Sequence, residues 1–345
     1  MPTGKIATPF NSWETVRCEL LHTRICDLGL RIEGSPVEVL VQQLLREFSA
    51  KGLMFRPVFY LTDGWGCPDR VPIIGIPFYL ADKRLVRIEQ EQTGEVEDEQ
   101  TAMMFLRHEA GHAVCYAYRL WKDTEWAEVF GPFTKPYRET FPAQPSSREF
   151  VRHLYSTSHG RTYAQKHPDE DFAETFAVWV TPRSAWRRRY QFWPALRKLK
   201  YVDALMRRIR CQPPLRQGGK LLNPVSEMTL LLAEHYGQRA ERYRAAARGF
   251  VDNRLRQVFP RISGNSVISA RDLLRKHHAL LLRSLRQWSA LEEDEAEAIL
   301  QKLEDRAGAL RLKLYRREER KKLLDVATMA TALAFELAYY GRLSS

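Results

Sequence analysis

The stretch His108-Glu109-Ala110-Gly111-His112 is the one around which the chain is organised. It reads HExxH, two histidines four residues apart with a glutamate directly after the first. On an α-helix, residues i and i+4 lie one above the other, about 6 Å apart along the axis, so two imidazoles there can bind one metal ion. The motif predicts a hydrolytic zinc site in which His108 and His112 are ligands and Glu109 is the general base, provided that a third ligand lies downstream.

The third ligand has to be found elsewhere in the chain. A catalytic zinc ion takes three protein ligands, and the pattern HExxHxxGxxH would place a glycine and a histidine where this chain has Cys115 and Tyr118. A glutamate on a second helix is the alternative, and Glu170 and Glu174 lie at positions i and i+4 on one helical face, with Asp171 turned away by about 100°. One of the two glutamates can bind the metal while the other accepts a hydrogen bond from the outer nitrogen of a ligand histidine.

The residues from Tyr163 to Ala177, YAQKHPDEDFAETFA, resemble the bacterial zinc-binding metallopeptidases of gluzincin type, whose second helix is written HPxEDxAETFA. They are also similar to the metalloprotease domains of anthrax lethal factor and of the Pro-Pro endopeptidases. The resemblance implies a zincin-like domain that uses Zn²⁺ to hydrolyse a protein or peptide substrate. It implies Glu170 as the third metal ligand, Glu174 as the support for His108 or its neighbour, and Tyr163 as the residue that assists the oxyanion.

The resemblance covers roughly residues 100–210. Members of that family often begin with a cysteine-rich zinc ribbon, which this chain lacks. Its five cysteines are odd in number, widely spaced and without a CxxC pair, which favours free thiols in a reducing compartment; a disulfide or a cysteine zinc site is the alternative.

The composition favours a folded cytoplasmic protein. Apolar residues make up 44% of the 345 residues and aromatic residues 11%, enough for a sizeable core. The N-terminal MPTGKIATPFNSWETV lacks the apolar stretch of a secretory signal, and the longest apolar run, 327–341, is too short to span a bilayer and contains Glu336. We expect no contact with a membrane, and we expect 327–341 to form a buried helix.

The charge is divided unevenly along the chain. Residues 182–345 carry 34 basic and 17 acidic side chains, whereas residues 1–181 carry 20 and 25, within a total of +12. This asymmetry predicts two domains and an acidic or nucleic-acid partner for the second, although solvated helices rich in arginine, such as the one expected to carry Arg187-Arg188-Arg189, would have the same composition. A nucleic-acid-associated protein and a catalytically silent interaction scaffold are therefore the alternatives to a peptidase.

The predicted fold class is α+β. Ser35, Pro36 and Glu38 indicate a helix start with a capping box. The segments 56–61, 73–80 and 85–88 favour strands of a small sheet, the second of them at an edge or bulged because it contains Gly75 and Pro77. The remaining predictions are helices over about 95–121 and 168–180, an irregular aromatic segment at 122–147 that could line substrate subsites or merely connect, and a short helix from Ser146.

Residues 1–210 are predicted to form the peptidase domain, 211–224 a linker rich in proline and glycine, and 225–345 a basic α-helical domain. Apolar spacing in the last domain indicates one helix over 267–288 and another over 296–314. Among other histidines, His167 before a proline is better explained as a helix cap than as a site residue. His153 and His159 are expected to be at the surface or hydrogen-bonded, and His277-His278 not to bind metal.

Overall fold

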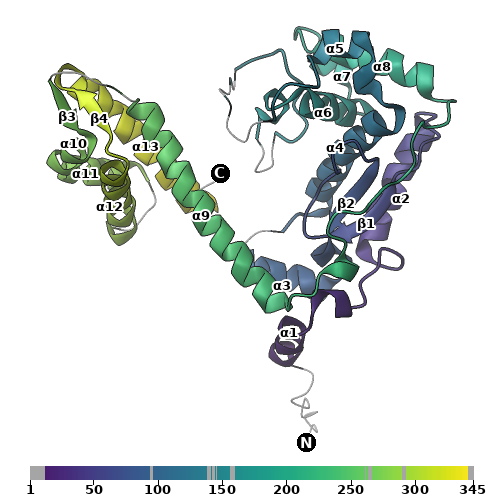
Figure 1. The fold of residues 1–345 in the computed structure, drawn as a ribbon, viewed down its shortest axis with the longest axis horizontal. Helices are drawn as coiled ribbons and strands as arrows, with labels where there is room; N and C mark the ends of the chain where they lie inside the picture. The colour runs from purple at the N-terminus through teal and green to yellow at the C-terminus, as the bar shows by residue number, and fades with distance from the viewer. Residues whose placement is uncertain are drawn as a thin grey trace, which may run out of the picture. The chain divides into compact units, whose positions relative to one another are not determined.

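A computed structural model describes residues 12–93, 96–137, 141, 144, 146–155, 160–260, 262, 266–289 and 293–340, with the backbone alone at 240–250, 294 and 336–340. The chain divides into two compact units, Met1–Ala233 and Glu234–Ser345 (Figure 1). Both are mainly helical, and each contains a two-stranded sheet. The described residues therefore agree with an α+β class in its coarse sense.

The first unit begins with helices and a small parallel sheet, and the metal-motif helix follows. In chain order its elements are α1 (Trp13–Leu21), η2 (Ile25–Asp27), α2 (Pro36–Ala50), β1 (Val58–Thr62), β2 (Ile73–Pro77), η3 (Phe78–Ala81), α3 (Lys83–Thr93), α4 (Glu99–Tyr118), η4 (Leu120–Lys122), α5 (Thr124–Phe130), η5 (Tyr163–Gln165), α6 (Pro168–Val180), α7 (Trp186–Arg189), α8 (Leu196–Ile209) and η6 (Val225–Glu227).

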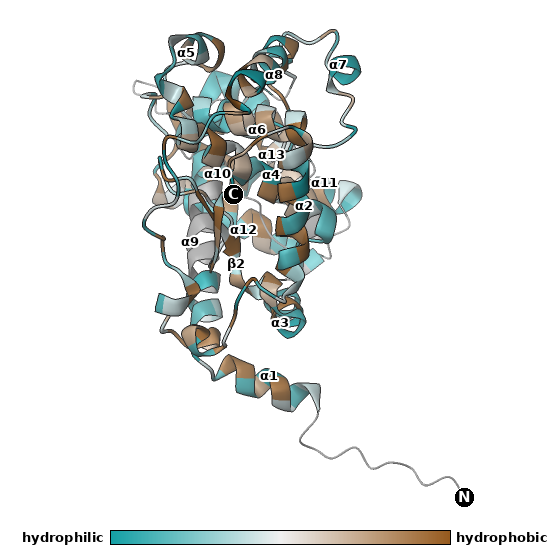
Figure 2. Ribbon diagram, turned by 90° about the vertical axis from the view of Figure 1, so that its right-hand side faces the viewer, coloured by the Kyte–Doolittle hydropathy of each residue, from teal (hydrophilic) through white to brown (hydrophobic). Residues whose placement is uncertain are grey.

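Helix α2 begins at Pro36, as its sequence predicts, and buries one apolar face. Figure 2 shows hydrophobic and hydrophilic residues along this helix. The predicted capping box is wrong: the Glu38 carboxylate accepts from the backbone N–H of Gly34 at 2.7 Å, and the Ser35 hydroxyl donates to the carbonyl of Ile32 at 2.7 Å. The predicted start of the helix is confirmed, because Pro36 at the first helical position fixes it. The groups that satisfy the free N–H donors of the first turn do not change this start.

The small sheet pairs β1 and β2 in parallel, from Val58 opposite Ile73 to Thr62 opposite Pro77. Every residue of β2 is buried, and the strand gives way to a 3₁₀ turn after Pro77. The opposite edge of β2 is paired at one point, where Gly75 and Gly66 exchange backbone hydrogen bonds of 2.8 and 3.3 Å. The sheet lies against α4 and supports the motif helix (Figure 1).

Three local predictions in this unit are wrong. Residues 85–88 lie in α3, where Leu85, Ile88 and Glu89 share a buried face, a helical period that a four-residue window cannot reveal. The segment 122–147 contains α5, with Trp126 and Phe130 buried. Ser146 does not start a helix, since 148–150 form bends.

The residues after α8 run along the first unit. The backbone N–H of Leu215 donates to the carbonyl of Ala117 at 2.9 Å, and the Thr62 hydroxyl donates to the carbonyl of Asn223 at 2.8 Å. Further on, the backbone of residues 228–232 bonds with that of residues 23–26. These bonds belong to the compact unit that ends at Ala233, whereas the sequence suggested a linker over 211–224 and a domain start at 225.

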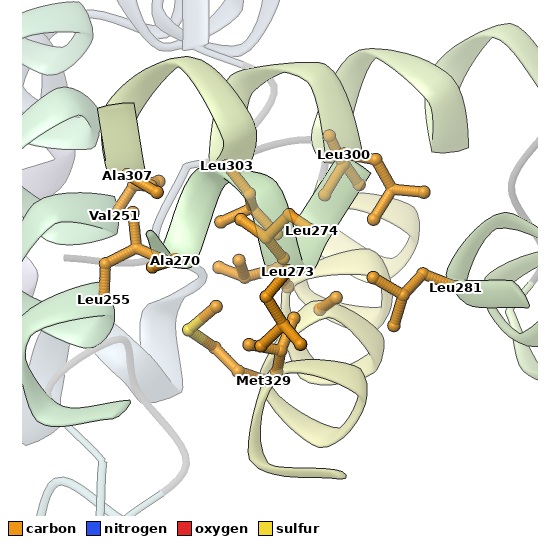
Figure 3. Close-up of a cluster of buried hydrophobic side chains, with 14 of the residues drawn as sticks. Val251, Leu255, Ala270, Leu273, Leu274, Leu281, Leu300, Leu303, Ala307 and Met329 are labelled. Atoms are coloured by element: carbon orange, nitrogen blue, oxygen red, sulfur yellow. The ribbon is translucent and has the colours of Figure 1, made fainter. Parts of the chain in front are cut away.

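The second unit is a helical cluster closed by a short antiparallel sheet. Its elements are α9 (Leu232–Val258, which starts at the boundary), β3 (Val267–Ser269), α10 (Ala270–Lys276), α11 (His278–Trp288), α12 (Glu293–Ala309), β4 (Lys313–Tyr315), η7 (Arg316–Glu318) and α13 (Glu319–Tyr340). In Figure 3, side chains that include Leu273, Leu300 and Met329 point toward one another from α10, α12 and α13.

The predicted single helix over 267–288 is wrong. Val267 pairs with Tyr315 in the β3–β4 ladder, and Ser269 caps α10 by accepting from the N–H of Asp272 at 3.4 Å. The spacing of apolar residues could not distinguish one helix from a strand and two helices that bury the same positions. Residues 327–340 of the predicted buried helix lie in α13, with Ala330, Leu333 and Ala334 buried, and position 341 lies outside the described residues.

No helix among the described residues is both long enough and apolar enough to cross a bilayer. All five cysteines are free, as the sequence predicted.

Candidate metal centre

Helix α4 carries the HExxH motif in a buried setting. Asp98 caps its N-terminus by accepting from the backbone N–H of Thr101 at 2.7 Å, and the helix ends where Arg119 takes a left-handed conformation with φ 53°. His108 and His112 are buried one turn apart, with ring centroids 4.9 Å apart and the rings edge to face at 75°. The helix therefore presents both imidazoles from one face to the interior of the unit.

Helix α6 brings the downstream carboxylates. His167 caps it through Nδ1, which accepts from the backbone N–H of Asp169 at 3.1 Å, while its Nε2 donates to the carbonyl of Lys135 at 2.8 Å. Pro168 occupies the first helical position. The histidine is thus a structural cap, as expected, and it places Glu170 in the first turn of the helix.

Helices α4 and α6 pack closely because a glycine lies between the two histidines of the motif. A Cβ at Gly111 would lie 2.7 Å from Cα of Ala173 and 3.1 Å from its carbonyl oxygen, closer than van der Waals contact allows. The close approach brings Glu170 within reach of both histidines, so Gly111 is part of the site although it has no side chain.

Three ligand-type atoms converge at this contact. The distances are 2.9 Å from His108 Nε2 to Glu170 Oε2, 3.2 Å between the two Nε2 atoms, and 3.3 Å from His112 Nε2 to Glu170 Oε2. Tetrahedral zinc with bonds of about 2.0–2.1 Å separates its ligand atoms by roughly 3.3 Å. The triangle therefore has the size of one face of a zinc tetrahedron. Within the described part of the chain, this is the one group of His, Cys, Asp and Glu side chains that could hold a metal ion.

The outer nitrogen of His108 is held by Glu174. His108 Nδ1 lies 3.0 Å from Glu174 Oε1, and the other carboxylate oxygen accepts from the backbone N–H groups of His153 at 2.6 Å and Leu154 at 3.0 Å. A carboxylate fixed in this way keeps the proton on Nδ1 and leaves the lone pair of Nε2 for a metal.

The outer nitrogen of His112 faces Asp169, a residue that the sequence-based reasoning missed. His112 Nδ1 lies 3.0 Å from Asp169 Oδ2, within ion-pair distance but at an angle that does not make a hydrogen bond. The Tyr116 hydroxyl donates to the same carboxylate oxygen. The position of Asp169 directly before Glu170 in the sequence is the signal that could have identified it.

The charge balance of the site favours a cation at its centre. Burial lowers the pKa of His108, but the hydrogen bonds with Glu170 and Glu174 outweigh it and raise the pKa to about 9. Burial also opposes the charge on His112, yet Asp169 and Glu170 hold its pKa well above its usual value. Three carboxylates around two imidazoles attract positive charge, which a proton or a metal ion can supply. The residues present therefore fit a bound metal dication.

Glu109 has the properties of a base within this site. It is buried, and burial raises the pKa of its carboxyl group, against the opposing effect of His108 and His112. Among the described residues, no hydrogen bond engages its carboxylate oxygens, which leaves them free to take a proton from a bound water.

Two tyrosines border the metal triangle. The ring of Tyr163 lies 5.5 Å from that of His108, and burial, together with Glu170, raises the pKa of its hydroxyl, so that it remains a proton donor. The Tyr137 hydroxyl donates to Glu170 Oε1 at 2.5 Å and hydrogen-bonds with Tyr163. Tyr137 belongs to the aromatic segment whose role was left open from the sequence, where no spacing singled it out.

Other residues considered from the sequence have separate roles. His153 is buried, its Nε2 donates to the carbonyl of Met104 at 3.0 Å, and burial lowers its pKa to about 4. Asp171 points away from the triangle and pairs with Lys198 at 2.6 Å. His159 lies outside the described residues.

In the second unit, His278 contacts Glu297 at 2.9 Å and Glu304 at 2.6 Å. Both acids come from α12, a different helix from the one that carries His278. His277 lies 3.3 Å from Glu319 of α13.

Helices α4 and α6 together define a class of metal site. One buried helix carries HExxH and the other carries a glutamate, and the three side chains are arranged to hold one metal ion. Residues 74–212 match the model of a family described as "Putative zinc-binding metallo-peptidase". This match spans α4 and α6, and with them all three ligand-type residues. Searches of curated proteins and of solved structures found no match.

Proposed function

We propose that the chain is a zinc-dependent endopeptidase of gluzincin type with a zincin-like catalytic domain. The observation that carries the proposal is the buried triangle of His108, His112 and Glu170 with the free carboxylate of Glu109 beside it. Two imidazoles and one carboxylate are a typical ligand set of hydrolytic zinc sites. The family match over 74–212 supports the same chemistry.

In this proposal, a zinc ion held by the triangle would act as a Lewis acid and lower the pKa of a bound water. Glu109 accepts a proton from the attacking water and delivers it to the leaving amine. Its raised pKa suits this transfer, because a carboxylate with a pKa nearer to neutrality takes a proton from water more readily and still gives it up to the more basic amine.

The surrounding residues hold this arrangement in place. Glu174 orients His108, and Asp169 orients His112, so that both Nε2 atoms face the centre. Tyr137 holds Oε1 of Glu170 and leaves Oε2 toward the histidines. The protonated hydroxyl of Tyr163 donates to the oxyanion that forms on the scissile carbonyl, the role that the resemblance to the metallopeptidases implies.

Metal analysis together with one variant tests the proposal. The purified protein is expected to contain one zinc per chain and to cleave a peptide library. Glu109→Gln should retain the zinc and lose cleavage by about 10²–10⁴-fold. Absence of stoichiometric metal in the purified protein would refute the zinc site. Undiminished cleavage by Glu109→Gln would refute the role of Glu109.

We propose a nucleic-acid contact as a second function, for the second unit alone. From the end of α12 to the first turn of α13, five exposed basic side chains make no ion pair among the described residues: Arg311, Lys313, Arg316, Arg317 and Arg320. Such a run suits the phosphates of a nucleic acid. Binding of a DNA duplex that weakens steeply with salt, and that is reduced in Arg316→Gln/Arg317→Gln, would support it; no binding at low salt would exclude it.

A further inference from the structure

A second candidate site lies at the end of α6 opposite Glu170. The chain there forms an open surface pocket of about 520 Å³, with walls from residues 181–188 and from Lys51 after α2. Thr181, which directly follows α6 and lies in the pocket wall, is about 16 Å along the helix axis from Glu170, so the pocket is separate from the metal centre.

The pocket is lined by four cations. They are Lys51, Arg183, Arg187 and Arg188. Arg183 and Arg188 are exposed, and neither makes an ion pair among the described residues. The positive charge of the pocket is therefore largely uncompensated.

Asp203 of α8 is the acid that contacts this cluster, and its charge is already shared. It accepts from Arg187 at 2.7 Å and from Arg207 at 2.8 Å, and also from the indole N–H of Trp179 at 3.0 Å. Burial lowers the pKa of Lys51, Asp203 raises it, and Arg187 lowers it again. One carboxylate thus serves two guanidinium groups and cannot neutralise the pocket.

Basic side chains near a helix C-terminus also offset its dipole, and Lys51, whose ammonium lies 4.5 Å from the ring of Trp179, can serve that purpose. That role does not account for Arg183 and Arg188, which face solvent. The backbone that presents them is unusual, because Arg183 at φ 55° and Ala185 at φ 45° are both left-handed, a conformation that non-glycine residues rarely adopt.

The lining between the cations is mostly apolar, with Thr181 and Ser184 as its polar members. Pro182 and Ala185 contribute to it, and so does Trp186, over whose ring the Arg187 guanidinium lies at 4.0 Å. A bare inorganic anion would pair with the cations but would gain nothing from contact with the apolar side chains of the lining. An acidic peptide fits both features of the pocket. Its carboxylates can pair with the arginines while an apolar side chain packs against Pro182, Ala185 and Trp186.

We propose that this pocket is an exosite that binds an acidic segment of the polypeptide substrate. The assignment rests on the proposed peptidase function, because an exosite gives an endopeptidase a second point of attachment on its substrate. It assigns the substrate a class: a protein with clustered acidic residues at a distance from the bond that is cleaved.

The test measures binding without requiring catalysis. A short end-blocked peptide of alternating glutamate and leucine is titrated into the full-length Glu109→Gln protein, and the matched peptide with glutamine for glutamate is the control ligand. The pocket variant is Arg183→Asn/Arg188→Gln, in which asparagine tolerates the left-handed backbone. The control variant is Arg31→Gln/Lys200→Gln, which removes the same charge from exposed residues outside the pocket.

The acidic peptide is expected to bind more tightly than the glutamine peptide, to lose affinity about fivefold in the pocket variant but not in the control variant, and to weaken with salt. Equal binding of the two peptides, or equal loss in both variants, would overturn the assignment. Binding of inorganic phosphate at the pocket without binding of the acidic peptide would overturn it as well. The two proposals can fail separately. If the protein held no zinc and cleaved no substrate, yet the acidic peptide still bound through the arginines, the peptidase proposal would fail and the acidic-segment site would stand.

Discussion

Gly111 of α4 lies so close to Ala173 of α6 that a Cβ at position 111 would be 2.7 Å from Cα of Ala173. We predict that Gly111→Ala forces the two helices apart, destabilises the first unit by about 1–3 kcal/mol and lowers zinc content. The strain has to exceed the preference of alanine for a helix, which acts in the opposite direction by about 0.5–1 kcal/mol.

Gly237 of α9 offers the matched control, because outside its own helical backbone no atom of the described residues lies within 4 Å of the place its Cβ would take. Gly237→Ala should be neutral or stabilising in the same thermal melt. Equal zinc content and equal melting in the wild type and Gly111→Ala would show that the helix contact does not set the geometry of the site.

Asp169 is predicted to hold His112 in its metal-binding orientation. Asp169→Asn should lower zinc affinity by about 10–100-fold, measured by competition with a chromogenic chelator, because an amide holds the ring less firmly than a carboxylate. Tyr116→Phe, which removes only the hydroxyl bonded to Asp169, should have a smaller effect in the same direction. A zinc affinity of Asp169→Asn equal to that of the wild type would mean that the 3.0 Å contact has no role in binding.

Substitutions of Tyr163 and Tyr137 should affect different steps, catalysis for the first and zinc binding for the second. Tyr163→Phe is expected to lower kcat by about 10²–10³-fold with zinc affinity unchanged, since it removes a donor to the oxyanion. Tyr137→Phe frees Oε1 of Glu170 and should instead weaken zinc binding. Metal titration and turnover at saturating zinc distinguish them, and an exchange of the two phenotypes would reverse the assigned roles.

Lys198 and Asp171 form a buried pair 2.6 Å apart that fastens α8 to α6. Lys198→Met leaves the Asp171 carboxylate buried without its partner and should cost about 3–5 kcal/mol of unfolding free energy. The double variant Lys198→Met/Asp171→Leu should recover most of that loss, because an apolar pair of similar volume has no charge to desolvate. Chemical denaturation of the wild type and the two variants measures both changes, and a double variant no more stable than the single one would contradict this account.

We predict that the stability of the second unit depends on pH through His278. Hydrogen bonds with Glu297 and Glu304 raise its pKa above 6.5, Arg275 also contacts Glu304 at 3.5 Å, and the neighbouring His277 faces Glu319. Because the folded pKa is the higher one, the stabilisation is complete below pH 6.5 and is lost as the pH rises through the folded value.

Relative to His278→Gln, the wild type should therefore lose melting temperature between about pH 6 and the raised pKa of His278. A titration of the His278 ring by NMR gives that pKa directly. Parallel melting curves for the two proteins over this range would show that the histidine adds nothing to stability.

Local sequence signals predicted the two site helices well. The predicted helix over 168–180 coincides with α6, and the i, i+4 spacing of His108 and His112 placed both imidazoles on one face of α4. Signals of this kind depend on residues within one or two turns, so they can be read without the fold. Leu85 to Ile88 failed as a strand because four residues do not separate the two periods.

The sequence by itself determined the identities of the candidate ligands and the order in which two helices present them. Only the tertiary structure decided that Gly111 lets those helices approach, that Asp169 and Tyr137 join the site, and that Lys51 meets Arg183 and Arg188 in one pocket. These relationships join residues far apart in the chain, and packing alone sets the distance between them. Helical periodicity reports which face of a helix is buried, but not which side chain of another element lies opposite it.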